Sequence, residues 1–278
     1  MASSENKESA GPTARYVAKV AKRMREKRGW SQVKLGKELG FTGAAVSAME
    51  TLAQPVSDEM LVALERVMGD GTGVFEEARE GVRMEKYPVY FRDYALLEEK
   101  ARSLMTYATM AIPGLFQTEA YARALIGMDF PPLAAARVTE LTDARMARTS
   151  IFDREPSPLI EAVIDEAALR RPFGTREIMH GQLLHLVELG KRRNVTLQVM
   201  PLNRGLSGEH AGGRGELQLI ETADLLRFAY LEAQGESMLI GDPAKVSLLT
   251  QRYAKIRAQA LSSEDSLGLI ERLAGEYR

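Results

Sequence analysis

The spacing of residue types between positions 32 and 49 constrains the fold of this chain more than any other feature. Two short crossing helices need apolar residues at their contact, a small residue at the crossing and a glycine in the turn. The sequence supplies five, one and one of these: Leu35, Leu39, Phe41, Val46 and Met49, then Gly36, then Gly40. Chance rarely fills all seven positions with the required type. The segment therefore predicts a helix-turn-helix motif, and an unrelated helical hairpin is the alternative.

Helix signals flank the motif on both sides. Val17, Val20, Ala21 and Met24 recur at i, i+3, i+4 and i+7, which predicts an amphipathic helix that Gly29 ends. Ser31 and Thr42 are predicted N-caps of the two motif helices, and "PVS" at 55–57 begins a further helix that runs to Met68. These signals predict a tail without structure over 1–13, a helical domain over 14–70 and a glycine-rich, charged linker over 71–87.

Basic residues are concentrated beside the motif, although the whole chain of 278 residues has a net charge of only -1. Between positions 15 and 37 a single acidic residue, Glu26, accompanies nine basic ones: Arg15, Lys19, Lys22, Arg23, Arg25, Lys27, Arg28, Lys34 and Lys37. Such clusters supply the salt-dependent phosphate contacts of proteins that bind nucleic acid. The local charge predicts double-stranded DNA as a partner, and a merely solvated helix face is the alternative.

The segment "WSQVKLGKELGFTGAAVSAME" resembles the XRE or phage-repressor type of helix-turn-helix, with its "SQ…L…LG…VS…E" skeleton. The resemblance implies an all-α, five-helix, lambda-repressor-like domain that binds palindromic half-sites as a homodimer, with the second motif helix, 42–50, in the major groove. It also implies that Gln32 faces the DNA backbone. An acidic residue at position 50 commonly pairs with a basic residue of the first helix, so Arg25 and Glu50 are predicted to form a structural ion pair.

The predicted DNA-binding residues fall into two groups. The motif contributes Gln32, Thr42, Gly43, Ala44, Ala45, Ser47 and Ala48, and the phosphate contacts come from Lys22, Arg28, Lys34 and Lys37. The second motif helix carries no Arg, Lys, Asn or Gln, the side chains that make bidentate contacts with base edges. Leu52 also replaces a usual glycine. Discrimination is therefore expected from methyl contacts, close backbone approach, DNA shape and dimer spacing.

The second half of the chain, 88–278, predicts an α+β domain with a small mixed sheet. Helices are expected over 94–108, 118–127, 133–150, 176–194, 243–261 and 263–276, and strands over 159–164, 195–199, 215–221 and 226–232. A strand, a helix and a strand in succession around 159–199 predict parallel neighbours joined by a crossover. Pro113 and Gly114 predict a turn, after which Thr118 caps a helix.

Five ordered blocks in this half resemble the C-terminal domain of actinobacterial regulators of the WhiJ-like or Scr1-like, antitoxin-like class. They are "IPGLFQTEAYARALI", "VIDEAALRRPFG", "QLLHLVELGKRRNVTLQVMPL", "FAYLE" and "ALSSEDSLGLIERL". The resemblance covers about residues 88–275. It implies a domain that senses a small partner protein encoded nearby, or an unknown small ligand, and it transfers no catalytic residues.

Side chains suited to catalysis are few. The chain has no cysteine, which excludes disulfides, thiolate metal sites and cysteine nucleophiles. His180 and His185 are five residues apart on one predicted helix, so they diverge, and no metal or cofactor is expected. Asp165 and Glu166 are expected to be structural, with paired catalytic carboxylates as the alternative. We expect no enzyme activity.

Two segments of the second half of the chain have two possible interpretations each. Leu115, Phe116 and Tyr121 are either core residues or the wall of a surface for a partner or ligand. The glycine-rich segment 204–215 is either a mobile loop over a binding site or a long connection.

The leading function is a cytoplasmic, DNA-binding transcription regulator, nucleoid-associated when bound. No signal peptide or membrane segment is expected. The alternative is an antitoxin-like protein that mainly binds a small partner and binds DNA weakly for autoregulation.

Overall fold

The computed structural model describes residues 11–54 and 56–278. The chain divides into two compact units, Met1–Arg92 and Asp93–Arg278, which are described separately. The predicted tail over 1–10 and the predicted helix start at Pro55 lie outside the described residues. Within the described part of that tail, Pro12 and Thr13 already belong to the first helix.

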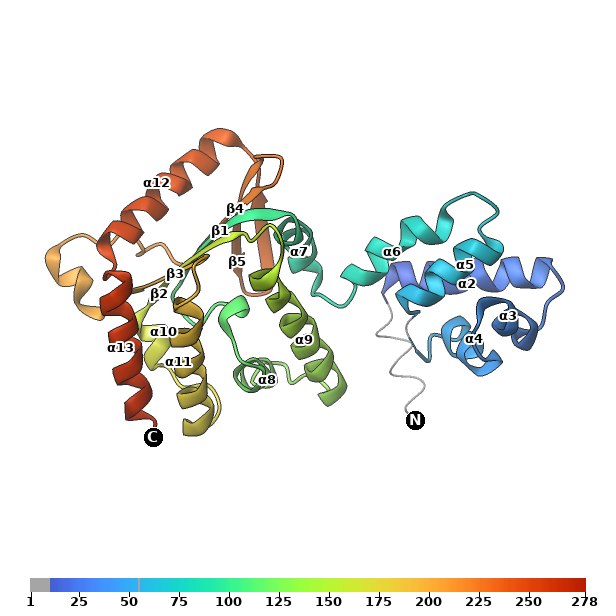
Figure 1. Cartoon of the computed structure of the whole chain (residues 1–278), viewed down its shortest axis with the longest axis horizontal. Coiled ribbons are helices and arrows are strands. Elements are labelled where there is room, and N and C mark those ends of the chain that lie inside the picture. The colour runs from blue at the N-terminus through green and yellow to red at the C-terminus, as the bar shows by residue number, and fades with distance from the viewer. Residues whose placement is uncertain (1–10, 55) are drawn as a thin grey trace. The chain divides into compact units, whose positions relative to one another are not determined.

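The first unit contains five described helices (Figure 1): α2 (Pro12–Lys27), α3 (Gln32–Leu39), α4 (Gly43–Glu50), α5 (Asp58–Met68) and α6 (Val74–Met84). The hydroxyls of Ser31, Thr42 and Ser57 accept hydrogen bonds from the first turns of α3, α4 and α5. These caps satisfy backbone N–H groups that would otherwise have no partner in the helix. The predicted all-α architecture of this unit is confirmed.

The apolar positions of the motif form the core of this unit. Leu35 and Val46 are fully buried, and Leu39 and Met49 are 3% exposed. A Cβ atom on Gly36 would lie 2.8 Å from the carbonyl carbon of Thr42, so no larger residue fits where the two motif helices meet. The spacing that predicted the motif thus corresponds to its packing.

The predicted linker over 71–87 contains α6, a difference from the sequence-based expectation. Phe75 of α6 is fully buried in the core of the helical unit. The Glu65 carboxylate accepts hydrogen bonds from the backbone N–H groups of Gly73 and Phe75, and Glu85 accepts one from Ala14. The glycines and charges that suggested a linker therefore cap helices and attach α6 to the unit.

The second unit is built on a six-stranded mixed sheet with the strand order β3-β2-β1-β4-β5-β6. Its strands are β1 (Ala101–Ala108), β2 (Leu159–Asp165), β3 (Val195–Met200), β4 (Leu217–Thr222), β5 (Arg227–Ala233) and β6 (Glu236–Ile240). Strands β1, β2 and β3 are parallel, whereas β4, β5 and β6 pair antiparallel. The predicted α+β class and the parallel β2–β3 pair are confirmed.

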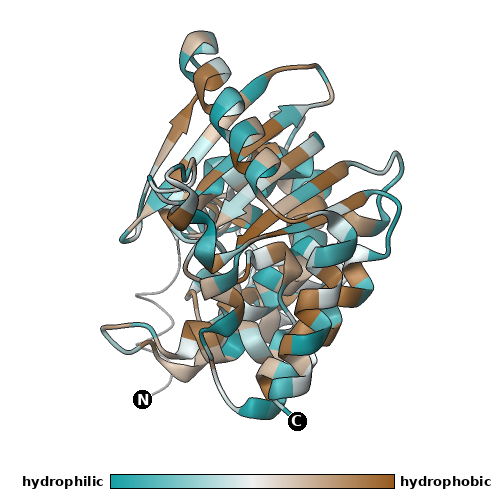
Figure 2. Ribbon diagram, turned by 90° about the vertical axis from the view of Figure 1, so that its left-hand side faces the viewer, coloured by the Kyte–Doolittle hydropathy of each residue, from teal (hydrophilic) through white to brown (hydrophobic). Residues whose placement is uncertain are grey.

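Helices cover both faces of this sheet (Figure 1). They are α7 (Arg92–Glu99), α8 (Glu119–Gly127), α9 (Ala135–Ala147), α10 (Glu166–Arg170), α11 (Arg176–Gly190), α12 (Pro243–Gln259) and α13 (Ser263–Glu276). Helix α12 packs against one face, where Ala229 is buried, and Tyr94 of α7 contacts Tyr230 on the other, with ring centroids 4.6 Å apart. Figure 2 shows apolar residues along the strands and alternating apolar and polar residues along the helices.

Two strands were not expected from the sequence. The predicted helix over 94–108 is α7 followed by β1, and β6 was not predicted at all. Strand β1 lies in the middle of the sheet between β2 and β4. This pairing outweighs the low strand propensity of a segment with few β-branched residues. Strand β6 has four exposed residues of five and therefore lacks the alternation of a half-buried strand.

Candidate DNA-binding interface

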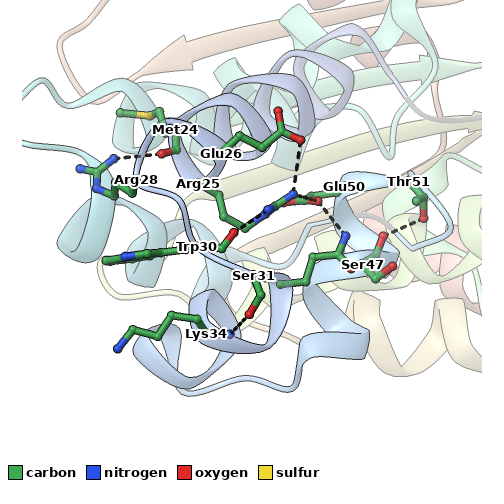
Figure 3. A network of polar contacts seen from close by, with 11 residues as sticks. Met24, Arg25, Glu26, Arg28, Trp30, Ser31, Lys34, Ser47, Glu50 and Thr51 are labelled. Atoms are coloured by element: carbon green, nitrogen blue, oxygen red, sulfur yellow. Dashed lines mark hydrogen bonds and ion pairs between the residues drawn. The ribbon is translucent and has the colours of Figure 1, made fainter.

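An ion pair joins the first helix of the unit to the end of the second motif helix (Figure 3). Arg25 donates from Nε to Glu50 Oε1 at 2.6 Å and from Nη2 to Glu50 Oε2 at 3.0 Å. Arg25 Nη1 also donates to the carbonyl oxygen of Trp30 at 2.7 Å. The guanidinium group therefore fixes α2, the segment before α3 and α4 to one another.

The ion pair is buried, and its hydrogen bonds are made to other groups of the protein. The Glu50 side chain is 2% exposed and that of Arg25 is 10% exposed. Burial raises the pKa of Glu50, but the hydrogen bonds from Arg25 and Gln32 outweigh it and hold that pKa below its ordinary value. The structure thus contains the predicted ion pair of Arg25 and Glu50, buried between α2 and α4.

Gln32 differs from its expected role. Its Nε2 donates to Glu50 Oε2 at 2.8 Å, so the amide nitrogen points into the motif and not toward a DNA backbone. Gln32, which is half-buried, is the third member of the polar cluster that we call the motif lock: Arg25, Gln32 and Glu50. The residue that opens α3 therefore connects the first motif helix to the second.

The outer surface of α4 consists of small side chains. Thr42 and Ala44 are exposed, and Ser47 and Ala48 are half-buried. The Thr42 hydroxyl accepts a hydrogen bond from the backbone N–H of Ala45 at 3.1 Å. Ala44 and Ala48 are one turn apart and so lie on the same face of the helix. This face of α4 is free of large side chains and allows close backbone approach.

Two of the predicted contact residues are small for reasons of packing. A Cβ atom on Gly43 would lie 2.9 Å from Cγ2 of Val33, so α3 leaves no room for a side chain there. Ala45 packs against the core. Val33, which the sequence reasoning missed, is 72% exposed beside the start of α4. No sequence pattern links Val33 to Gly43, because their contact crosses the turn between α3 and α4.

The predicted phosphate contacts divide into two pairs. Lys22 and Lys37 are exposed, and neither takes part in an ion pair within the described residues. Arg28 pairs with Asp70 at 2.6 Å, and Lys34 pairs with Glu38 at 2.6 Å. The Lys34–Glu38 pair is exposed and contributes little to stability, whereas the Arg28 side chain is only 23% exposed and also donates to the carbonyl oxygen of Met68 at 3.4 Å. The local positive charge is smaller than the count over residues 15–37 suggested, because Glu38 and Asp70 lie outside that range in the sequence but beside the basic residues in the structure.

Leu52 adopts a backbone conformation that favours glycine. Its φ is +61°, in the left-handed region, which costs an ordinary residue about 1 kcal/mol. Its side chain packs against the core of the unit, which offsets that cost. Leu52 therefore occupies the turn after α4 in a conformation that glycine adopts without strain.

Of the two interpretations of Leu115, Phe116 and Tyr121, the structure supports core residues and contradicts a surface for a partner or ligand. Leu115 is 7% exposed, Phe116 is 1% exposed and Tyr121 is fully buried. Phe116 packs edge-on against Phe152, and the Tyr121 hydroxyl accepts a hydrogen bond from the backbone N–H of Ile112 at 3.3 Å. These residues face inward because the turn at Pro113 folds the loop onto the unit, so they form core and not a surface.

Buried amides hold this loop in place. Gln117 donates to the carbonyl oxygen of Ile112 at 2.6 Å. Gln182 of α11 donates to the carbonyl oxygen of Phe116 at 2.7 Å and accepts from the backbone N–H of Thr118 at 2.7 Å. We call Gln117 and Gln182 the amide clamp. The sequence signal was a glutamine on the apolar face of α11, where Met179, Leu183 and Leu186 are also buried.

The two acidic residues at the junction of β2 and α10 have structural partners. Asp165 caps α10 through the backbone N–H of Ala167 at 2.9 Å and accepts a hydrogen bond from the Tyr107 hydroxyl at 3.2 Å. Glu166 pairs with Arg170 at 2.7 Å and accepts from the backbone N–H of Leu202 at 3.1 Å. Among residues 11–54 and 56–278, no three His, Asp or Glu side chains are grouped to hold a metal ion.

The glycine-rich segment 204–215 packs against β1. A Cβ atom on Gly212 would lie 2.3 Å from the Tyr107 hydroxyl, so the backbone itself covers that side chain. The Gln259 side chain accepts a hydrogen bond from the backbone N–H of Ala211 at 2.9 Å. These contacts attach the middle of the segment to the unit.

Comparison with known families assigns both units. Residues 22–70 match the family described as Helix-turn-helix, and residues 91–272 match the family described as Domain of unknown function (DUF5753). No curated protein and no solved structure matches the chain. No helix in the described part of the chain is long and apolar enough to cross a membrane. The first match contains α3, α4 and the motif lock, and the second contains the whole sheet, so the chain belongs to the DUF5753 family and carries an XRE-type helix-turn-helix domain at its N-terminus.

Proposed function

We propose that this protein is a sequence-specific transcription regulator that binds double-stranded DNA by placing α4 in the major groove. The observation that carries the proposal is the motif lock, which fixes α4 from its inner side while Thr42, Ala44 and Ala48 remain on its outer side. A rigid helix with an accessible outer face is what insertion into a groove requires.

The affinity for DNA and the discrimination between DNA sequences come from different residues. Lys22 and Lys37 contact phosphates directly, and Arg28 and Lys34 exchange Asp70 and Glu38 for phosphate. Ala44 and Ala48 lack hydrogen-bonding side chains, so discrimination comes from contact with thymine methyl groups, close backbone approach and the shape of the DNA. A single half-site is therefore bound weakly, and the protein binds palindromic DNA as a homodimer.

The DUF5753 domain controls DNA binding through a small partner protein or a small ligand, as its resemblance to WhiJ-like or Scr1-like regulators suggests. We propose that the domain acts by binding and not by catalysis, without a cofactor. The use of Asp165 and Glu166 in capping and pairing supports this view. The protein then works in the cytoplasm, where it has access to the nucleoid.

A second function is antitoxin-like: binding of a small partner, with weak autoregulatory DNA binding. Two observations favour it. Half of the predicted phosphate contacts already have acidic partners, and the outer face of α4 has no side chain that makes bidentate base contacts. In this case the DNA-binding surface needs a partner protein to become effective.

Selection of bound duplexes from a random library, followed by fluorescence anisotropy on the best duplex, tests the proposal. We expect the full-length protein alone to enrich a palindromic sequence and to bind it with an affinity that falls steeply with salt. Enrichment of no sequence at low salt would contradict the proposal. Enrichment that requires the product of an adjacent small gene would favour the antitoxin-like function.

A further inference from the structure

The segment that follows β3 crosses the ends of three parallel strands. Strands β1, β2 and β3 run in the same direction, so their carboxyl ends lie at one edge of the sheet. The chain leaves β3 and returns to β4, which lies on the other side of β1. In open sheets with parallel strands, ligands bind outside the carboxyl ends of the strands, where the strand order reverses. Residues 201–216, which we call the crossing segment, cover that position in the DUF5753 domain.

Hydrogen bonds at both ends hold the crossing segment against this edge. The Glu166 carboxylate, directly after β2, accepts a hydrogen bond from the backbone N–H of Leu202 at 3.1 Å. At the other end of the segment, the Glu216 carboxylate accepts a hydrogen bond from the backbone N–H of Thr109, directly after β1, at 2.9 Å. The segment therefore passes the ends of β3, β2 and β1 in turn.

Two buried nitrogen atoms at the crossing segment have no acceptor. Gln259, at the end of α12, is 5% exposed, and its side-chain oxygen accepts a hydrogen bond from the backbone N–H of Ala211 at 2.9 Å. Its Nε2 has no hydrogen-bond partner among residues 11–54 and 56–278, and neither has the buried Nε of Arg204, within the segment. A buried donor without an acceptor is destabilising and marks a position for a missing partner.

Arg204 and Gln259 belong to the same region of the domain. Lys255, one turn before Gln259 on α12, pairs with Glu209 of the crossing segment at 3.0 Å. The hydrogen bond from Lys255 lowers the pKa of Glu209, and the positive charge of Arg204 acts in the same direction, so its guanidinium group lies near this pair. Two residues after Glu209, Ala211 is bonded to Gln259. The crossing segment thus places Arg204 near the C-terminal end of α12.

The nearby carboxylate of Asp165 already has hydrogen-bond donors. It accepts hydrogen bonds from the Tyr107 hydroxyl at 3.2 Å and from the backbone N–H of Ala167 at 2.9 Å. The groups without partners are donors, and one of them carries a positive charge, so the missing partner is an anionic acceptor. A guanidinium group and an amide together suit the oxygens of a carboxylate or phosphate group.

We propose that the DUF5753 domain binds an anionic small molecule beneath the crossing segment, where a carboxylate or phosphate group accepts hydrogen bonds from Gln259 Nε2 and Arg204 Nε. The site rests on the ligand control proposed above and gives that ligand a chemical class and a place. The bound anion connects Arg204 of the segment to Gln259 of α12 and so fixes the segment to the edge of the sheet. The helix-turn-helix motif contributes no residue to this site.

Calorimetric unfolding of the full-length protein tests the site with two probes, inorganic phosphate and succinate. Each is added at about 10 mM and compared with sodium chloride of equal ionic strength. We expect at least one probe to raise the unfolding temperature by about 3 °C. A rise with phosphate alone identifies phosphate esters as the ligand class, and a rise with succinate alone identifies carboxylates. The absence of a rise with both probes would overturn the proposal.

Two variants show whether the probes bind at the predicted atoms. Gln259→Glu keeps the oxygen that accepts from Ala211 and removes the amide donor, and Arg204→Met keeps the apolar stem and removes the guanidinium group. Both should lose the rise in unfolding temperature. The matched controls Gln251→Glu and Arg214→Met change exposed residues of the same helix and the same segment, and they should keep it. A rise that persists in Gln259→Glu or in Arg204→Met would overturn the proposal.

Hydrogen exchange of the Ala211 amide measures the effect of the anion on the crossing segment. The probe that raises the unfolding temperature should slow this exchange about tenfold, because opening of the segment then requires its release. An unchanged exchange rate would contradict binding beneath the segment. Selection from the random duplex library separates this failure from that of the proposed function. A protein that enriches a palindromic sequence but binds neither probe retains its DNA-binding role and loses only this site.

Discussion

The motif lock of the first unit and the amide clamp of the second both bury polar side chains, yet they leave their surroundings in opposite states. Arg25, Gln32 and Glu50 hold α4 from within, and its outer face stays accessible. Gln117 and Gln182 draw the loop after β1 inward, and its apolar residues become core. The comparison shows that buried polar side chains can have two effects. Where they bond to the inner side of a helix, the outer side stays accessible; where they bond to a loop, the apolar residues of that loop become buried.

The largest expected effect is the loss of the acidic member of the motif lock. Glu50→Ala leaves the buried Arg25 without its carboxylate, and removal of one partner from a buried ion pair costs about 3 kcal/mol. Trp30 is the only tryptophan and lies in the first unit, so its fluorescence during urea denaturation reports this unit alone.

The matched control for that experiment is Glu26→Ala. Glu26 also contacts Arg25, at 3.7 Å, but its side chain is 54% exposed, so we expect a change below about 0.5 kcal/mol. If both variants lose the same free energy of unfolding, the lock is not a special feature of the motif.

The amide clamp should respond less strongly. Gln182→Met keeps the length of the side chain but leaves the carbonyl oxygen of Phe116 and the backbone N–H of Thr118 without their partner, which costs about 2 kcal/mol. Hydrogen exchange of the Thr118 amide measures the local opening. The exposed Gln251→Met serves as the control, and an unchanged exchange rate in Gln182→Met would show that the clamp does not hold the loop.

The sequence predicted local structure where a few neighbouring residues determine it. The caps at Ser31 and Thr42 and the small residue Gly36 follow from short-range rules, and each is found in the structure. The pairing of Arg25 with Glu50 was accessible through resemblance. These features need no knowledge of distant parts of the chain.

The features that the sequence missed or left open depend on long-range packing. Strand β1 exists because β2 and β4 flank it, and both contribute residues far away in the sequence. Phe116 and Tyr121 are buried because α11 supplies Gln182 from more than 60 residues away. The role of Gly43 depends on Val33 across the turn. No local pattern reports such neighbours.

The smallest effect is expected on the basic surface beside the motif. Lys22→Ala removes one phosphate contact, so the affinity should fall about threefold for every sequence and the salt slope should decrease by about 1. Arg28→Ala should change affinity less, because Arg28 must first leave Asp70. Anisotropy titrations at several salt concentrations measure both. A loss confined to one sequence would instead place Lys22 against a base.

The most direct test of the account is whether the accessible face of α4 determines sequence preference. Ala44 is exposed on this face and makes no contact that an arginine would break within the described structure. Selection from a random duplex library with wild type and Ala44→Arg should give consensus sequences that differ at one or two positions in each half-site, with a guanine favoured by the variant. Identical consensus sequences from two folded proteins would contradict the account, because α4 would then not lie in the groove.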